Sequence, residues 1–140
     1  YHVSVGASFD LLETSSGRVI LTFQNEKERK RRLERRKFYS KFEKSSSISI
    51  SELKKIEKLF SKNTMKKIEI NKYELVKSLQ IKGVTNISVP IFDYTNNAIA
   101  ALTIPFVDRI ISKGELNLDG VKKLLIKSAA LLSSEMGYKE

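Results

Sequence analysis

The feature that most constrains the fold is a pair of apolar runs on either side of a short polar turn. The first run, residues 83–93, reads GVTNISVPIFD, and the second, residues 98–105, reads AIAALTIP. Asn96 and Asn97 precede the second run, and asparagine tolerates the positive φ angles that a tight turn requires. The two runs therefore predict an antiparallel β-hairpin whose loop holds two residues, or four if it begins at Tyr94.

The two faces of this hairpin differ in character, because successive side chains of a strand point to opposite sides. One face is apolar and is predicted to join the core; it is formed by Val89, Ile91, Leu102 and Ile104. The other face is small and polar, and Phe92 lies at its end. Its remaining members are Asn86, Ser88, Pro90 and Thr103. One side of an antiparallel sheet often meets water, but this side lacks the Lys and Glu that are common elsewhere in the chain, which favours the floor of a binding pocket.

The rest of the chain alternates between extended and helical patterns. Residues 1–6 alternate like a short strand. Helices are expected at residues 12–23, 26–44, 49–63, 72–79 and 118–136. The last helix is expected to end at Gly137 and to bury Val121, Leu124, Leu125, Leu131 and Leu132. Helices with an antiparallel hairpin predict an α+β fold, a sheet with helices packed on it.

Composition excludes several classes of protein. A chain of 140 residues with 41% hydrophobic and 30% charged residues is typical of one folded domain. It contains no apolar run long enough to cross a membrane and no secretory signal, so we expect a cytoplasmic protein. The absence of cysteine excludes disulfides, thiolate catalysis and most structural zinc sites.

Catalysis is also unexpected. His2 is the only histidine, so Ser15 and Ser16 lack a general base to activate them. Asp93 and Asp108 lack the spacing of metal ligands. We therefore expect neither an enzyme nor a cofactor.

The positive charge is concentrated in one segment. Residues 26–44 hold ten Lys or Arg against four Glu, which is six of the ten net positive charges of the chain. One interpretation is a solvated helix that contacts the domain through Leu33, Phe38 and Phe42. The alternative is a basic nucleic-acid-binding protein that uses the Lys/Arg-rich helix of residues 27–37 to bind phosphates. Its candidate residues are Arg31, Arg32, Arg35 and Arg36.

Three blocks of sequence resemble a known family. They are residues 11–21, LLETSSGRVIL; the hairpin of residues 83–93 and 100–105; and residues 131–138, LLSSEMGY. Together they resemble the C-terminal, GAF-like effector-binding domain of IclR-type transcriptional regulators. Residues 24–72 match this family only in being helical.

The resemblance implies an antiparallel sheet flanked by helices that binds a small organic acid or aromatic metabolite. It implies that the ligand is contacted by Ser15, Ser16, Asn86 and Thr103, to which the hairpin pattern adds Ser88. It further implies a homodimer or tetramer. The whole chain, residues 1–140, would be this domain, truncated at its N-terminus, with the DNA-binding winged helix-turn-helix preceding Tyr1 and absent from the chain. A sensor-like domain that only dimerises remains a further alternative.

The chain departs from the family pattern near the implied pocket. Leu12 stands where histidine is common, Asn86 where cysteine is common, and Pro105 replaces a hydroxyl residue. We therefore expect a ligand other than the small keto acids known for some relatives, or one that is held differently. Lys77 could supply a cation for an acidic ligand, or it could be a surface lysine.

Overall fold

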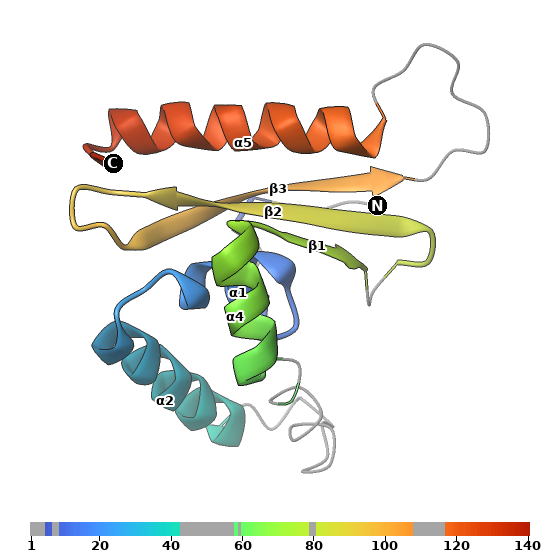
Figure 1. Ribbon diagram of the computed structural model, residues 1–140. Helices are drawn as coiled ribbons and strands as arrows, with labels where there is room; N and C mark the ends of the chain where they lie inside the picture. The colour runs from blue at the N-terminus through green and yellow to red at the C-terminus, as the bar shows by residue number, and fades with distance from the viewer. Residues whose placement is uncertain (1–4, 7–8, 43–57, 59, 79–80, 108–116) are drawn as a thin grey trace.

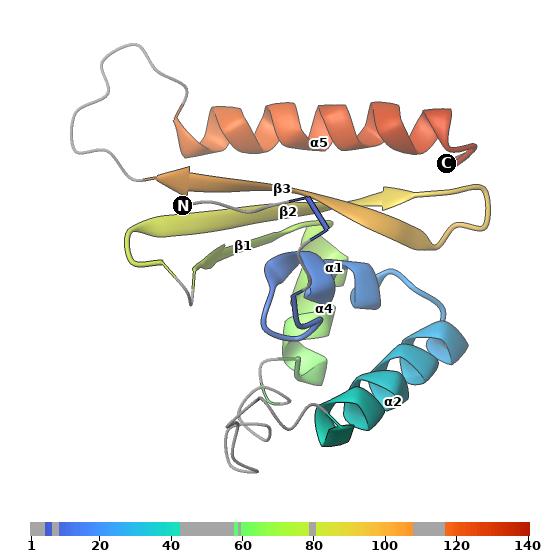
Figure 2. The same cartoon turned by 180° about the vertical axis from the view of Figure 1, so that it is seen from behind.

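The computed structural model describes residues 5–6, 9–42, 58, 60–78, 81–107 and 117–140 (Figure 1). A three-stranded antiparallel sheet in the order β1-β2-β3 lies between two helical layers. Its strands are β1 (Glu74–Lys77), β2 (Val84–Phe92) and β3 (Ala98–Val107). The helices are α1 (Ser15–Thr22), α2 (Glu26–Phe42), α4 (Lys62–Asn71) and α5 (Leu118–Glu135). The long helix α5 covers one face, and α1 and α4 lie on the other (Figures 1 and 2). The predicted α+β class is confirmed.

The hairpin of β2 and β3 has the predicted two-faced register. Val89 pairs with Leu102, and Ser88 pairs with Thr103. This is the register of the four-residue loop, and it holds from Val84 to Ile91. The pairing then shifts between Ile91 and Phe92, and Asn96 adopts the expected positive φ of 65°.

β1 pairs with β2 only as far as Ser88, so the backbone N–H of Phe92 has no partner on β1, and α5 supplies one. Ser133 on α5 accepts this N–H at 3.0 Å and donates its own hydroxyl proton to the carbonyl of Ala129. Ser133 is buried, so the helix and the irregular end of the strand are joined by a hydrogen bond shielded from water.

The main core lies between the sheet and α5. Ile87, Val89 and Ile91 of β2 contact Leu125 and Ala129 of α5. The partly buried residues around them include Leu102 and Ile104, so the predicted core face of the hairpin is confirmed. Burying aliphatic side chains of this size stabilises the fold by about 1.5–3 kcal/mol each.

A smaller core fixes α1 and α2 on the opposite side. Leu12 and Leu21 are buried there, with Leu33 and Phe60 packed against them. Arg29 of α2 donates to the carbonyls of Leu21, Thr22 and Gln24, which closes the C-terminal end of α1. A cation at that end is favourable because the last helical carbonyls have no partner within the helix.

The buried face of α5 is narrower than its sequence pattern predicts. Leu125, Ala129 and Ser133 form the buried stripe. Leu124, Leu131 and Leu132, all expected in the core, are 51%, 62% and 41% exposed. Among the described residues the helix rests on three strands through small residues, so its flanking leucines extend beyond the surface that it covers.

The prediction of a helix over residues 72–79 is wrong. Residues Glu74–Lys77 form β1, which pairs antiparallel with Thr85–Ser88. The helix before this strand is α4. Ser61 caps its start, and it continues past Asn63, where the predicted 49–63 helix is expected to end. Lys72 ends α4 in a left-handed conformation, and backbone bonding to β2 then outweighs the weak helical spacing.

Other predicted elements are confirmed or lie outside the described residues. The helices expected around residues 12–23, 26–44 and 118–136 correspond to α1, α2 and α5, and Gly137 has the expected positive φ. Most of the expected 1–6 strand, the start of the 49–63 helix, and His2 and Asp108 lie outside the described residues. In the part of the chain that the structure describes, no helix is long and apolar enough to cross a membrane.

Candidate functional site

Three of the five predicted ligand residues come together where α1 meets the sheet. Ser16 of α1, Ser88 of β2 and Thr103 of β3 form a connected group that we call the hydroxyl cluster. The Thr103 hydroxyl oxygen lies 2.6 Å from that of Ser16 and 2.8 Å from that of Ser88. Ser88 is completely buried, whereas Ser16 and Thr103 are partly exposed. The hydroxyl cluster is therefore formed by three elements, α1, β2 and β3.

Local structure fixes how α1 reaches this point. Thr14 caps the helix by accepting the N–H of Gly17 at 3.1 Å. A Cβ added at Gly17 would lie 2.0 Å from the backbone carbonyl oxygen of Leu11. Only glycine therefore allows the chain before α1 to fold back so closely onto the helix, which carries Ser16 toward the sheet.

The other two predicted ligand residues occupy different positions. Asn86 lies two residues before Ser88 on β2, on the same face, and pairs with Pro105 on β3. The Ser15 hydroxyl is buried and has no hydrogen-bond partner among the described residues. Ser15 is thus a buried donor that is not joined to the hydroxyl cluster.

Lys77 does not reach this face. It pairs with Thr85, and directly paired residues share a face, so Lys77 lies on the α5 side of the sheet, opposite the hydroxyl cluster. Its side chain is exposed. The interpretation of Lys77 as a surface lysine fits this position, and its suggested role as a cation beside these hydroxyls is wrong.

The charged residues beside the hydroxyl cluster are instead Glu74 and Arg18. Glu74 pairs with Ser88 across the sheet, and the Arg18 guanidinium lies 2.8 Å from its carboxylate. Sequence analysis missed this pair because it assigned Glu74 to a helix. The four residues of β1, ELVK, do not alternate between polar and apolar, so there was no clear signal for this strand in the sequence.

A cavity of about 750 Å³ lies between α5 and the end of β2 that extends beyond β1. Pro90 and Phe92 contribute its strand wall, Ala129 and Ser133 its helix wall, and Lys72 a cation. The Phe92 ring stacks on Tyr138 at 4.8 Å between centroids. Of the predicted polar face, Pro90 and Phe92 therefore line this cavity, whereas the three residues of the hydroxyl cluster are not among its described lining residues.

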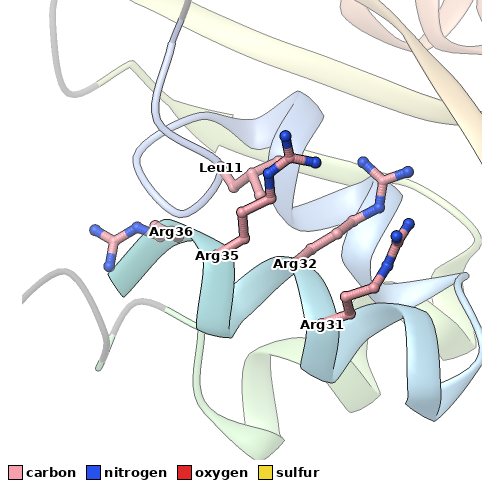
Figure 3. Close-up of a pocket in the computed structure, with 5 residues that line it drawn as sticks. All are labelled: Leu11, Arg31, Arg32, Arg35 and Arg36. Atoms are coloured by element: carbon pink, nitrogen blue, oxygen red, sulfur yellow. The ribbon is translucent and has the colours of Figure 1, made fainter. Parts of the chain in front are cut away.

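The four arginines of the alternative nucleic-acid interpretation also lie together. With Leu11 they line a hollow of about 290 Å³ on the surface of α2 (Figure 3). The Arg36 side chain is only 10% exposed and forms an ion pair with Asp10 at 2.7 Å. Arg31, Arg32 and Arg35 are exposed. As predicted, Leu33 packs against the domain; the side chains of Phe38 and Phe42 lie outside the described residues.

Comparison with known proteins identifies relatives of this chain. Residues 1–134 match the model of the family described as bacterial transcriptional regulator IclR C-terminal. No curated protein matches the sequence at a significant level.

Solved structures with the same fold include Thermotoga maritima IclR, at 25% identity and a TM-score of 0.64. The C-terminal domain of Escherichia coli transcriptional regulator KdgR gives 23% and 0.63, and the Agobacterium tumefaciens repressor BlcR gives 19% and 0.61. These three matches cover 99%, 95% and 97% of the present chain. The chain spans 51% of the Thermotoga and Agobacterium proteins and 74% of the Escherichia coli domain.

Proposed function

Because this chain belongs to the IclR C-terminal family of bacterial transcriptional regulators, we propose that its hydroxyl cluster is the centre of a small-molecule effector site. The family consists of transcription regulators, so the prediction that the chain is not an enzyme is confirmed. The observation that carries the proposal is that the Thr103 hydroxyl oxygen lies 2.6 Å from that of Ser16 and 2.8 Å from that of Ser88.

The hydrogen-bonding capacity of these hydroxyls exceeds what they use on each other. Three hydroxyls carry three protons, and the two links that join them consume two. One donor therefore remains for a ligand, and rotation of Ser16 or Thr103 can release others. The buried Ser15 hydroxyl and the amide of Asn86 supply further polar groups nearby.

This inventory suits a ligand that accepts hydrogen bonds. A carboxylate or carbonyl group needs directed donors in an otherwise apolar site, and the start of α1 at Thr14–Gly17 adds partial positive charge. We therefore propose a small organic acid or an aromatic metabolite as the effector. The carboxylate of Glu74 lies close to Ser88 on the same face, but Arg18 neutralises it.

Thermal unfolding with a panel of carboxylic acids and aromatic metabolites tests the proposal. A compound present at 100 times its Kd stabilises the folded state by about 2.7 kcal/mol, a rise in Tm of roughly 10 °C for a domain of this size. Thr103→Val, alone or with Asn86→Leu, should abolish that rise, whereas Thr103→Ser should retain most of it. Thr95→Val, in the hairpin turn, is the matched control and should leave the rise unchanged.

Two outcomes would contradict the proposal. If no compound raises Tm, the alternative of a sensor-like domain that only dimerises is favoured. If a compound raises Tm equally in the wild type and in Thr103→Val, it binds elsewhere, and the cavity beside Phe92 and Tyr138 becomes the site to examine.

The whole regulator would extend beyond this domain. We propose that a DNA-binding winged helix-turn-helix precedes residues 1–140 in the complete protein, since the chain spans about half of the Thermotoga and Agobacterium proteins. We further propose that the domain forms a homodimer or tetramer. The exposed leucines of α5 support this assembly, because exposed apolar groups are often interaction surfaces.

Sedimentation analysis of the wild type and of Leu124→Glu with Leu131→Glu tests the assembly. The wild type should sediment as an oligomer and the variant as a monomer. A monomeric wild type at micromolar concentration would contradict the proposed assembly.

A further inference from the structure

We propose that the exposed arginines of α2 bind the phosphate backbone of DNA. This surface, which we call the arginine face, consists of Arg31, Arg32 and Arg35 above the hollow next to Leu11 (Figure 3). The inference is independent of the effector site, because α2 lies away from the sheet face that carries the hydroxyl cluster (Figures 1 and 2).

Two arginines of α2 have structural contacts. Arg29 is committed to three backbone carbonyls at the end of α1, and Arg36 holds Asp10 through its Nε at 2.7 and 2.9 Å. Arg31 forms an ion pair with Glu28 at 2.9 Å, but its side chain is 64% exposed. An exposed ion pair of this kind contributes little to stability, so a phosphate can compete for Arg31.

The spacing along α2 forms a row of guanidinium groups. Arg31 and Arg35 are one helical turn apart, about 6 Å along the axis, and Arg32 lies between them. Lys27 and Lys30, both exposed, extend the positive charge toward the start of the helix. Guanidinium groups present donors in a planar fork that matches phosphate oxygens. The carboxylates of this helix near the row are Glu28 and Glu34.

The shape of the site favours a polymer over a small molecule. Small-molecule sites enclose most of their ligand, whereas among the described residues this hollow is lined by Leu11 and by four arginines along a surface helix. Six of the ten net charges of the chain lie in residues 26–44, so the attraction is strong and local. An open, strongly basic helix is suited to a continuous line of phosphates.

Fluorescence anisotropy with a labelled DNA duplex of arbitrary sequence and chain 1–140 tests the inference. Affinity should fall linearly on a log–log plot against salt, with a slope of about −0.9 for each phosphate neutralised. The triple variant Arg31→Gln, Arg32→Gln, Arg35→Gln should bind at least tenfold more weakly at low salt, with a slope shallower by about 2 to 3. Its Tm should match that of the wild type, because these side chains are exposed.

The matched control removes the same charge elsewhere. Lys62, Lys66 and Lys67 are exposed on α4, and changing all three to Gln should reduce DNA affinity by less than threefold. If both triple variants lose affinity equally, net charge alone attracts DNA and the arginine face is not the site.

Further outcomes overturn the inference. Absence of DNA binding at 50 mM salt does so, as does binding to phosphatidylserine vesicles with no binding to DNA. If the triple variant fails to fold, the single change Arg32→Glu replaces it, and unchanged DNA affinity in that variant rejects the proposal.

Discussion

The guanidinium of Arg18 on α1 and the carboxylate of Glu74 on β1 form an ion pair that is almost fully removed from water. Arg18 Nη2 lies 2.8 Å from Glu74 Oε1, and the two side chains are 6% and 11% exposed. Arg18 Nε also donates to both carboxylate oxygens, and Nη1 donates to the carbonyl of Leu12. The pair therefore fixes α1 against the edge strand of the sheet.

Breaking this pair from one side should be costly. Arg18→Met leaves the Glu74 carboxylate buried without a partner, and we expect a loss of about 3–5 kcal/mol in the free energy of unfolding. The double variant Arg18→Met, Glu74→Leu should recover much of that loss, because no buried charge remains. Urea unfolding measures both. Equal stability of Arg18→Met and the wild type would show that the pair is solvated in solution.

Gly17→Ala should destabilise the domain by more than a surface change can. Its new Cβ would lie 2.0 Å from the Leu11 carbonyl oxygen, which is backbone and cannot rotate away. We expect a loss of roughly 2–3 kcal/mol, in the range of overpacked cores, although alanine favours a helix more than glycine does. Thermal unfolding measures the effect, with Ser128→Ala on the exposed side of α5 as the control. A Tm equal to that of the wild type would contradict the close approach.

Ser133→Ala should lower the free energy of unfolding, because Ser133 bonds to the backbone at the end of β2. Without the hydroxyl, the Phe92 N–H loses its partner at 3.0 Å, at a cost of about 1–3 kcal/mol. Ser134→Ala removes an exposed hydroxyl next to it and should change stability by less than about 0.5 kcal/mol. Denaturant titration of the two variants compares them. Equal effects would mean that water replaces Ser133.

The stability of the fold should depend on pH through Asp119 at the start of α5. Hydrogen bonds from Lys123 and Lys122, together with their charges, hold the pKa of Asp119 below its usual value. A lowered folded-state pKa stabilises the fold above the unfolded-state pKa, and that stabilisation is lost as pH falls through the folded-state pKa. NMR titration of the Asp119 carboxyl should give a lower midpoint in the wild type than in Lys122→Gln, Lys123→Gln. Equal midpoints would reject these contacts.

The hairpin and its two faces could be predicted from sequence because strand alternation is local information. That Ser88 and Thr103 share a face follows from the position of the turn, and their direct pairing follows from the four-residue loop, one of the two loop lengths considered. The meeting of Ser16 with Thr103 does not, because it depends on how α1 folds back over Gly17. For Ser16 the resemblance to a family supplied what periodicity could not.

The errors have a common physical origin. β1 was assigned to a helix because a four-residue edge strand owes its conformation to backbone bonds with β2, which leave little trace in its own sequence. Leu124, Leu131 and Leu132 were placed in the core because apolar spacing does not report how wide a surface the helix covers. Both depend on neighbouring elements.

The hydrogen bond between Ser133 and Phe92 affects whether a strand of another copy of this protein can pair with β2. β1 pairs with β2 only up to Ser88, so no strand of the described residues pairs with the last residues of β2 on that side. The backbone of Val84 bonds to Ser78 on that side, and alternation directs Pro90 and Phe92 the same way. Pro90 has no N–H to offer, and Ser133 occupies that of Phe92. An incoming strand therefore finds no donors there, and this edge resists the intermolecular sheet growth that leads to aggregation.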